Sequence, residues 1–306
     1  MQHSKDTNKQ TSLPPWFKVS LGGVRPRQNV RNLLKDLRLN TVCEGAQCPN
    51  LCECWKNGTA TFLILGKKCT RNCLFCNIPG GTPEEPEADE PDRICEAARR
   101  LDLSYVVVTS VTRDDLDDYG AGHFRAVIDK IHQELPGVGI EVLTPDFNGH
   151  TGLLDCVLDA RPTVFNHNIE TCERLTREIR SDADYQRSLN ILRHAASRKD
   201  ITGTAIKSGL MIGLGEADTE IHDTLADLSE AGVEILTIGQ YLAPTKQHWH
   251  VSRYVTPDEF NEWQSIAYNK YGFKAVFSAP LVRSSYKAAE AAEKIGRKND
   301  EESQKI

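Results

Sequence analysis

Short apolar runs alternate with amphipathic segments along most of the chain. Aliphatic and β-branched runs predict strands, and apolar residues spaced three or four positions apart predict helices between them. The predicted strands span residues 62–65, 105–111, 139–143, 164–169, 210–214 and 235–242. The intervening helices span residues 94–101, 124–135, 153–158, 185–196 and 221–228. This α/β alternation favours a parallel sheet, which right-handed crossovers curl into a barrel or part of one.

The segments on either side of this repeat have a different pattern. Residues 30–39 predict a short helix, and residues 256–271 predict a helix followed by an apolar run. Residues 43–55 predict a loop, because Gly45 and Pro49 argue against a long helix. We therefore divide the chain into five parts. They are a disordered leader (1–13), an N-terminal extension (14–58), a partial barrel (59–255), a C-terminal helix, strand and Arg-Ser-Ser-Tyr segment (256–290), and a charged, frayed tail (291–306).

Composition and charge narrow the functional classes. The 306 residues carry a formal net charge of −6, which argues against nucleic acid as a partner. The apolar runs are shorter than the ~20 residues of a membrane-spanning helix, so the sequence predicts no membrane association. Ten cysteines without an export signal indicate metal ligands and reduced thiols in the cytoplasm.

Seven of these cysteines fall between Cys43 and Cys76 in two spacings. The first is a Cys-x4-Cys-x5-Cys triplet with Cys52 as an extra thiol, and the second is a Cys-x3-Cys-x2-Cys triplet on the loop after strand 62–65. Zinc sites favour two paired Cys-x2-4-Cys units, and disulfides need an oxidising compartment. Iron–sulfur clusters explain the pattern better. A cubane cluster held by three thiolates leaves one iron open to a non-protein ligand.

Polar residues follow several predicted strands at their carboxyl ends, where a parallel barrel places its functional groups. They occur in residues 109–115, 166–170 and 207–216. Each group alone is typical of turns and caps, but together with the second cysteine triplet they indicate one site. Gly213 and Gly215 would allow close approach to an adenosine. His167 is equally compatible with the core and with the site.

These motifs resemble the lipoyl synthase family of radical S-adenosylmethionine (SAM) enzymes, over residues 14–288. The likeness rests on both cysteine triplets and on Arg283-Ser284-Ser285-Tyr286. Residues 41–44, 48–50, 109–115, 166–168 and 207–209 also match the family pattern. Two residues depart from the family pattern. Cys52 is a thiol where the pattern has none, and Lys287 stands where histidine is common.

The resemblance implies a partial (β/α)6 parallel barrel of radical SAM type with N- and C-terminal extensions. It also implies SAM as co-substrate and two 4Fe–4S clusters. Cys69, Cys73 and Cys76 would hold the SAM-cleaving cluster. Cys43, Cys48, Cys54 and Ser285 would hold an auxiliary cluster that donates sulfur. The predicted cofactor contacts on the same rim are Thr109, Ser110, Asn168, Lys207, Gly213 and Gly215.

The implied reaction inserts two sulfur atoms, at carbons 6 and 8, into an octanoyl chain on a lysine of a carrier protein. The carriers would be the lipoyl domains of 2-oxoacid dehydrogenase E2 subunits or the glycine-cleavage H protein. A ferredoxin or flavodoxin would supply electrons. The candidate cations for docking the carrier protein near the barrel mouth are Lys67, Lys68, Arg71 and Lys287. Two alternatives stay open: a different radical SAM enzyme acting on a small molecule or tRNA, and a two-cluster electron carrier.

Overall fold

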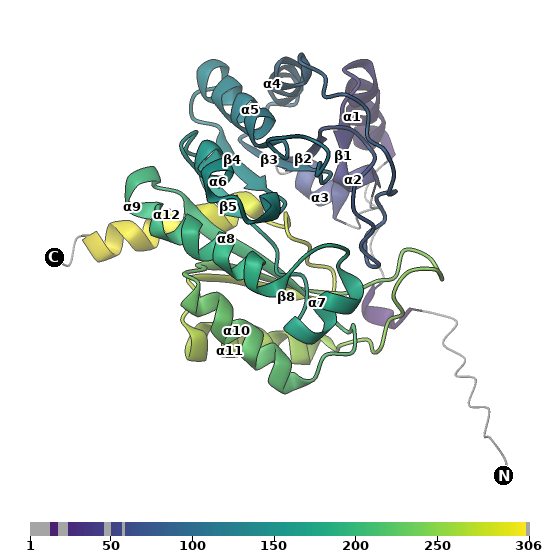
Figure 1. The fold of residues 1–306 in the computed structure, drawn as a ribbon, viewed down its shortest axis with the longest axis vertical. Coiled ribbons are helices and arrows are strands. Elements are labelled where there is room, and N and C mark those ends of the chain that lie inside the picture. Colours follow the sequence, from purple (N-terminus) through teal and green to yellow (C-terminus); the bar gives the residue numbers. More distant parts are fainter. Residues whose placement is uncertain (1–12, 18–23, 46–49, 57–58, 304–306) are drawn as a thin grey trace, which may run out of the picture.

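The computed structural model describes residues 13–17, 24–45, 50–56 and 59–303, in which eight strands form one sheet in the order β1 to β8 (Figure 1). The strands are β1 (Asn40–Thr41), β2 (Thr59–Ile64), β3 (Tyr105–Ser110), β4 (Gly139–Leu143), β5 (Val164–Asn166), β6 (Ala205–Ile212), β7 (Ile235–Gln240) and β8 (Ala275–Ala279). β1 is antiparallel to β2, and from β2 to β8 each strand pairs in parallel with the next. The predicted parallel α/β sheet is confirmed.

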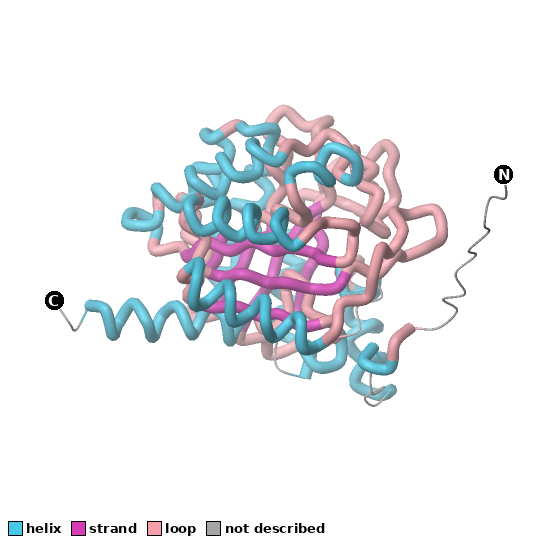
Figure 2. Tube along the Cα trace, turned by 90° about the horizontal axis from the view of Figure 1, so that it is seen from below, coloured by secondary structure: helices cyan, strands magenta, loops and turns pink. Residues whose placement is uncertain are grey.

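Helices cover the outside of this sheet (Figure 2). The α-helices are α1 (Val24–Asp36), α2 (Val42–Gly45), α3 (Leu51–Lys56), α4 (Glu90–Arg100), α5 (Ala121–Glu134), α6 (Thr151–Leu158), α7 (Glu173–Ile179), α8 (Tyr185–Ser197), α9 (Lys199–Thr202), α10 (Asp218–Glu230), α11 (Pro257–Tyr271) and α12 (Ala288–Ser303). Two 3-10 helices are η1 (Pro15–Phe17) and η2 (Phe147–Gly149). No helix among the described residues is long and apolar enough to cross a membrane.

Alternate residues of the strands pack in two different cores, as expected for a sheet buried on both faces. Val106 and Val108 face the helices and join the main core. Their neighbours Tyr105 and Val107 face the other way and contact the start of α12 at Ala288. The same inner face carries small and aliphatic residues of β5 to β8, which pack on Ala291 and Ile295 of α12. The first turns of α12 therefore fill the amino-terminal end of the barrel.

Several elements differ from their predicted extents. The segment 43–55 contains α2 and α3, since Gly45 ends one short helix and Pro49 precedes the other. β6 starts five residues before its predicted beginning, because Lys207 is a buried strand residue with a charged side chain. The helix α12 continues through the tail to Ser303 instead of fraying. The predicted leader, apart from Leu13, lies outside the described residues.

The C-terminal segment belongs to the same sheet. β8 pairs in parallel with β7, so the barrel has seven parallel strands where the pattern predicted six. Helix α11 before it begins with the predicted capping arrangement, in which Thr256 and Glu259 cap each other's backbone amides. The chain then returns across the carboxyl edge of the barrel through residues 280–287.

Candidate active site

The loop after β2 carries Cys69, Cys73 and Cys76, and hydrogen bonds fix its shape. The backbone amide of Thr70 donates to the carbonyl of Thr112 (3.1 Å), and that of Cys69 donates to the carbonyl of Pro79 (2.9 Å). The first bond ties the loop to the segment after β3, and the second closes the loop on itself. The three sulfur atoms are thereby held around one cavity of about 340 Å³.

Backbone amides also point at the sulfur atoms of this triplet. Cys69 Sγ accepts from the amides of Arg71 (3.4 Å) and Thr112 (3.3 Å), and Cys76 Sγ accepts from Ile78 (3.5 Å). Such donors stabilise thiolate charge and tune the potential of iron–sulfur clusters. Burial raises the pKa of Cys73 and raises that of Cys76 to about 11. Any metal that these thiols bind must therefore displace their protons.

A buried ion-pair network clamps the same loop. Arg71 is 7% exposed and donates bidentate hydrogen bonds to both Asp114 and Asp146 at 2.8 to 3.1 Å. Thr70 Oγ1 donates to Asp114 as well (2.8 Å). Burial alone would raise the pKa of Asp146, but Arg71 holds it well below its usual range. Arg71 is thus a structural clamp, and its prediction as a docking cation is wrong because it is buried and two edges of its guanidinium are occupied by carboxylates.

The first cysteine set reaches the same cavity from the N-terminal extension. Cys43 in α2 and Cys54 after the first turn of α3 line it together with Ser285. Asn50 Nδ2 donates to the carbonyl of Leu281 (2.6 Å), which joins the N-terminal extension to the C-terminal segment. Cys48 lies outside the described residues, and only the backbone of Cys52 is described.

Ser285 does not cap a helix. The following helix α12 begins at Ala288, and Ser285 lies in the preceding turn. Serine is a favoured helix cap, but Arg283 to Tyr286 form a turn that precedes the helix. Tyr286 directs its hydroxyl to the carboxylate of Glu53 (3.2 Å), which places Ser285 beside α3.

Several buried polar atoms on the cavity wall have no partner among the described residues. They are Ser110 Oγ, Thr144 Oγ1, His167 Nε2 and Asn168 Oδ1. Unpaired buried polar atoms are costly and mark sites completed by a ligand. The donor set therefore fits bound cofactors. No three described His, Cys, Asp or Glu side chains converge as the ligands of a single ion would, whereas thiols spread around a cavity suit a polynuclear cluster.

His167 is a member of this site. Its Nδ1 lies 2.9 Å from the carbonyl of Thr144, which can only accept, so Nδ1 carries the hydrogen and Nε2 presents a lone pair. Burial and the nearby guanidinium of Arg180 lower the pKa of His167 to about 4. The imidazole is therefore neutral at pH 7 and offers an acceptor to the cavity.

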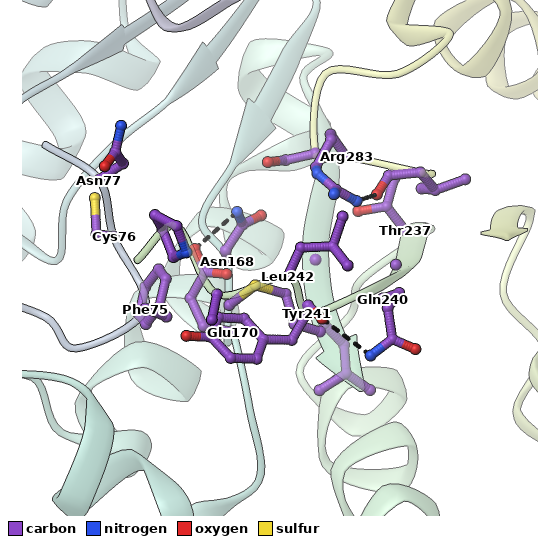
Figure 3. Close-up of a pocket in the computed structure, with 18 of the residues that line it drawn as sticks. Phe75, Cys76, Asn77, Asn168, Glu170, Thr237, Gln240, Tyr241, Leu242 and Arg283 are labelled. Atoms are coloured by element: carbon purple, nitrogen blue, oxygen red, sulfur yellow. Dashed lines mark hydrogen bonds between the residues drawn. The ribbon is translucent and has the colours of Figure 1, made fainter. Parts of the chain in front are cut away.

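A second cavity of about 510 Å³ adjoins the first and shares Phe75, Cys76, Asn168 and Glu170 with it. Figure 3 shows Phe75, Asn168 and Glu170 close together near Cys76, with Thr237 and Gln240 on the opposite side. Glu170 accepts a hydrogen bond from Asn168 Nδ2 (3.0 Å), and burial raises the pKa of its carboxyl. Its φ of 66° is a strained left-handed conformation, common at ligand sites.

Not every predicted contact reaches these cavities. Thr109, Ser110 and Asn168 line the first cavity, but Lys207, Gly213 and Gly215 line neither. Lys207 Nζ lies deep in the barrel and donates to both oxygens of Glu141 at 2.8 and 3.0 Å. The amide of Gly213 is bound by the carboxylate of Glu216 (2.6 Å).

Glycine is required at two other positions. A Cβ on Gly209 would lie 2.6 Å from Asn168 Oδ1 and 2.8 Å from Thr237 Oγ1, so this glycine makes room for a cavity side chain. A Cβ on Gly239 would lie 2.2 Å from the carbonyl oxygen of Val282. The end of β7 therefore lets the returning C-terminal segment pass close by.

The sequence analysis gave no individual role to three charged residues of the site, Asp146, Glu170 and Arg180, although Glu170 lay within the predicted polar group 166–170. Asp146 and Glu170 were visible as polar residues just after predicted strands, the position that parallel barrels use for function. Arg180 follows α7, a helix that the pattern did not predict. It carried no sequence signal.

Comparisons with known proteins agree with this geometry. Residues 63–228 match the family model described as Radical SAM superfamily. Streptococcus suis SuiB, bound to its precursor peptide SuiA, has a similar structure with a TM-score of 0.56 at 11% identity, over 84% of this chain and 55% of SuiB. HydG, a maturase of the FeFe-hydrogenase, has a TM-score of 0.56 at 13% identity, over 81% and 65%. The fold and the cysteine loop thus define a radical SAM protein.

Closer relatives narrow the family. A lipoyl synthase of Caldicellulosiruptor saccharolyticus is 50% identical over 94% of this chain and 99% of its own. That of Nitratidesulfovibrio vulgaris is 50% identical over 95% and 96%, and that of Methanocella arvoryzae 48% over 90% and 93%. This chain belongs to the lipoyl synthase family.

Proposed function

We propose that the two adjoining cavities are the reaction chamber in which this radical SAM sulfurtransferase converts an octanoyl group into a lipoyl group. One observation carries the proposal: Cys69, Cys73 and Cys76 line the same cavity as Cys43, Cys54 and Ser285. A site that brings two ligand sets to one chamber can generate a radical and deliver sulfur within the same space. A simple electron carrier would need neither the cavity nor the unpaired polar atoms around it.

The ligand sets fit the two 4Fe–4S clusters of the family. Cys69, Cys73 and Cys76 hold one cluster, and Cys43, Cys48, Cys54 and Ser285 hold the other. When bound, the clusters and SAM supply the electron, the radical and the sulfur atoms. Unactivated methylene groups have no acidic proton, so the cofactors and not a side-chain base must open these carbon–hydrogen bonds.

The second cavity is proposed to bind SAM. Glu170 lies on the wall that both cavities share, accepts a hydrogen bond from Asn168 (3.0 Å) and offers a partner for an amino acid's ammonium group. Arg180 lines the first cavity and offers a charge opposite to that of the carboxylate group. Thr109 and Ser110 line only the first cavity, where the substrate chain would lie. Lys207, Gly213 and Gly215 act through the shape of β6 and the loop that follows it.

The C-terminal segment is proposed to close the chamber. Asn50 and Tyr286 join it to the N-terminal extension, which limits the entry of water to a site that handles a radical. The substrates are octanoylated lipoyl domains of 2-oxoacid dehydrogenase E2 subunits or the glycine-cleavage H protein. A ferredoxin or flavodoxin supplies electrons, and the reduced cysteines suit a cytoplasmic enzyme.

The test is anaerobic incubation of the iron-loaded protein with SAM, a reductant and an octanoylated lipoyl-domain peptide, followed by mass spectrometry. The expected products are 5′-deoxyadenosine and a lipoyl peptide. Replacement of Cys69, Cys73 and Cys76 by alanine should abolish both products. Cys156→Ala, in α6 and away from both cavities, is the matched control and should retain them. Cleavage of SAM by the triple variant would refute the assignment.

Ser285→Cys tests the role of the serine. A thiolate suits cluster iron better than an alkoxide, so the second cluster should form and hold its sulfur more firmly. We expect 5′-deoxyadenosine with little lipoyl product. Lipoyl product at the wild-type rate would show that the cluster does not open at Ser285.

A further inference from the structure

A third hollow, of about 700 Å³, lies on the outer side of the cysteine loop and is defined here as the α1 groove. Its walls come from α1, from β1, and from residues 77–79 just after Cys76. Figure 1 shows α1 beside β1 and β2, at the edge of the sheet. The groove is separate from both reaction cavities.

The α1 groove is positively charged. Arg31, Lys35 and Lys67 line it and are exposed, and no carboxylate is among the described residues of its wall. The remaining polar lining is formed by amides and a threonine: Gln28, Asn32, Asn40, Asn77 and Thr41. The whole chain has a net charge of −6, so this is a local reversal of sign. Such a surface attracts an acidic partner and orients it.

The floor of the groove is the wall of the reaction chamber. Leu63 and Ile78 line both the groove and the cavity that holds the cysteine triplet. The amide of Ile78 donates to Cys76 Sγ (3.5 Å), so a cluster ligand is one hydrogen bond away from a groove residue. Asn77, beside Cys76 in Figure 3, lines both the groove and the second cavity.

This wall distinguishes between the two kinds of protein partner. An octanoyl chain must enter the chamber through an opening, and the packed side chains of Leu63 and Ile78 stand in its way at the groove. An electron needs no opening, because it crosses packed side chains and hydrogen bonds. The groove therefore suits a partner that delivers an electron and no atoms.

We propose that the α1 groove is the docking site of an acidic one-electron donor protein of the iron–sulfur or flavin class. The inference rests on the proposed function, because the acceptor is the cluster held by Cys69, Cys73 and Cys76. The donor is oxidised by one electron and that cluster is reduced by one electron. No bond forms or breaks in this step, and no proton crosses the wall.

The test uses the triple charge reversal Arg31→Glu, Lys35→Glu and Lys67→Glu in the iron-loaded protein. SAM cleavage is measured with a pre-reduced small acidic ferredoxin and, separately, with dithionite. We expect the KM for ferredoxin to rise about tenfold or more, while the rate with dithionite stays within about twofold. Raising ionic strength from about 0.05 M to about 0.3 M should weaken ferredoxin use by the wild type only.

The matched control carries Arg125→Glu, Arg193→Glu and Lys270→Glu on the remote helices α5, α8 and α11, with the same change in net charge. It should keep the wild-type KM for ferredoxin. An unchanged KM in the groove variant would overturn the proposal. So would a raised KM for the octanoylated carrier with dithionite as reductant, since the groove would then bind the carrier. Failure of the wild type to cleave SAM with either reductant would instead refute the proposed function.

Discussion

Lys207→Met should destabilise the fold without weakening SAM binding directly. Lys207 and Glu141 are both 0% exposed, and their ion pair lies in the interior of the barrel below the cavities. Asn166 Nδ2 donates to the same carboxylate (3.0 Å), so the three side chains form one buried network between β4, β5 and β6. Methionine keeps most of the volume of lysine and removes the charge.

The expected loss of stability follows from the carboxylate that stays buried after its partner is removed. Glu141 would retain one donor, Asn166, and would lose its only counter-charge among the described residues. Breaking a fully buried ion pair by removing one partner costs about 3–5 kcal/mol. For a chain of this size, roughly 2 °C of melting temperature corresponds to each kcal/mol, so the midpoint should fall by about 6–10 °C.

The assay is thermal unfolding of the cluster-free protein under anaerobic, reducing conditions, together with SAM binding to the iron-loaded protein below the transition. The double variant Lys207→Met with Glu141→Gln is the matched control. It removes both charges and keeps an oxygen acceptor for Asn166, so most of the lost stability should return. The reasoning is refuted if Lys207→Met melts like the wild type and loses SAM affinity, because Lys207 would then be a direct ligand.

Three further variants test separate parts of the site. Gly239→Ala should displace the returning C-terminal segment and lower the iron content after anaerobic loading, whereas Gly152→Ala, with no atom near its Cβ position, should not. With a pKa of about 4 against an ordinary 6.5, folded His167 resists protonation, so stability is lost as pH falls from about 6.5 to about 4. The free energy of unfolding of His167→Gln, measured with urea across this pH range, should therefore fall by roughly 3 kcal/mol less than that of the wild type. An equal fall in the two proteins would contradict the prediction. Arg71→Lys keeps the charge but not the planar fork, so SAM cleavage should fall about tenfold, while exposed Arg125→Lys should have no effect.

The alternating pattern predicted the parallel sheet well because most of its strands are buried on both faces and read as continuous apolar runs. It failed where function interrupts that pattern. β6 begins with Ala205-Ile206-Lys207-Ser208, and the buried lysine hid the first half of the strand. The short helices α2 and α3 were hidden because glycine and proline separate two elements of only four and six residues.

The site was predictable as far as its chemistry is local in sequence. The spacing of Cys69, Cys73 and Cys76 predicts one ligand set, and the structure places these cysteines beside three of the six predicted cofactor contacts. The role of Arg71 could not be predicted, since its partners Asp114 and Asp146 come from two other loops. A cation near a cluster is equally compatible with docking and with clamping until its partners are known.

The two proposed ligand sets depend on different parts of the fold. The loop of Cys69, Cys73 and Cys76 is fixed by neighbours that follow β3 and β4, through Thr112 and the two aspartates that hold Arg71. The second set needs the two ends of the chain to meet, with Asn50 bound to Leu281 across 231 positions. That meeting also needs β8 paired on β7 and the absence of a side chain at Gly239. The chamber is therefore complete only when the last strand is in place, and loosening the C-terminal segment should affect sulfur delivery before it affects radical generation.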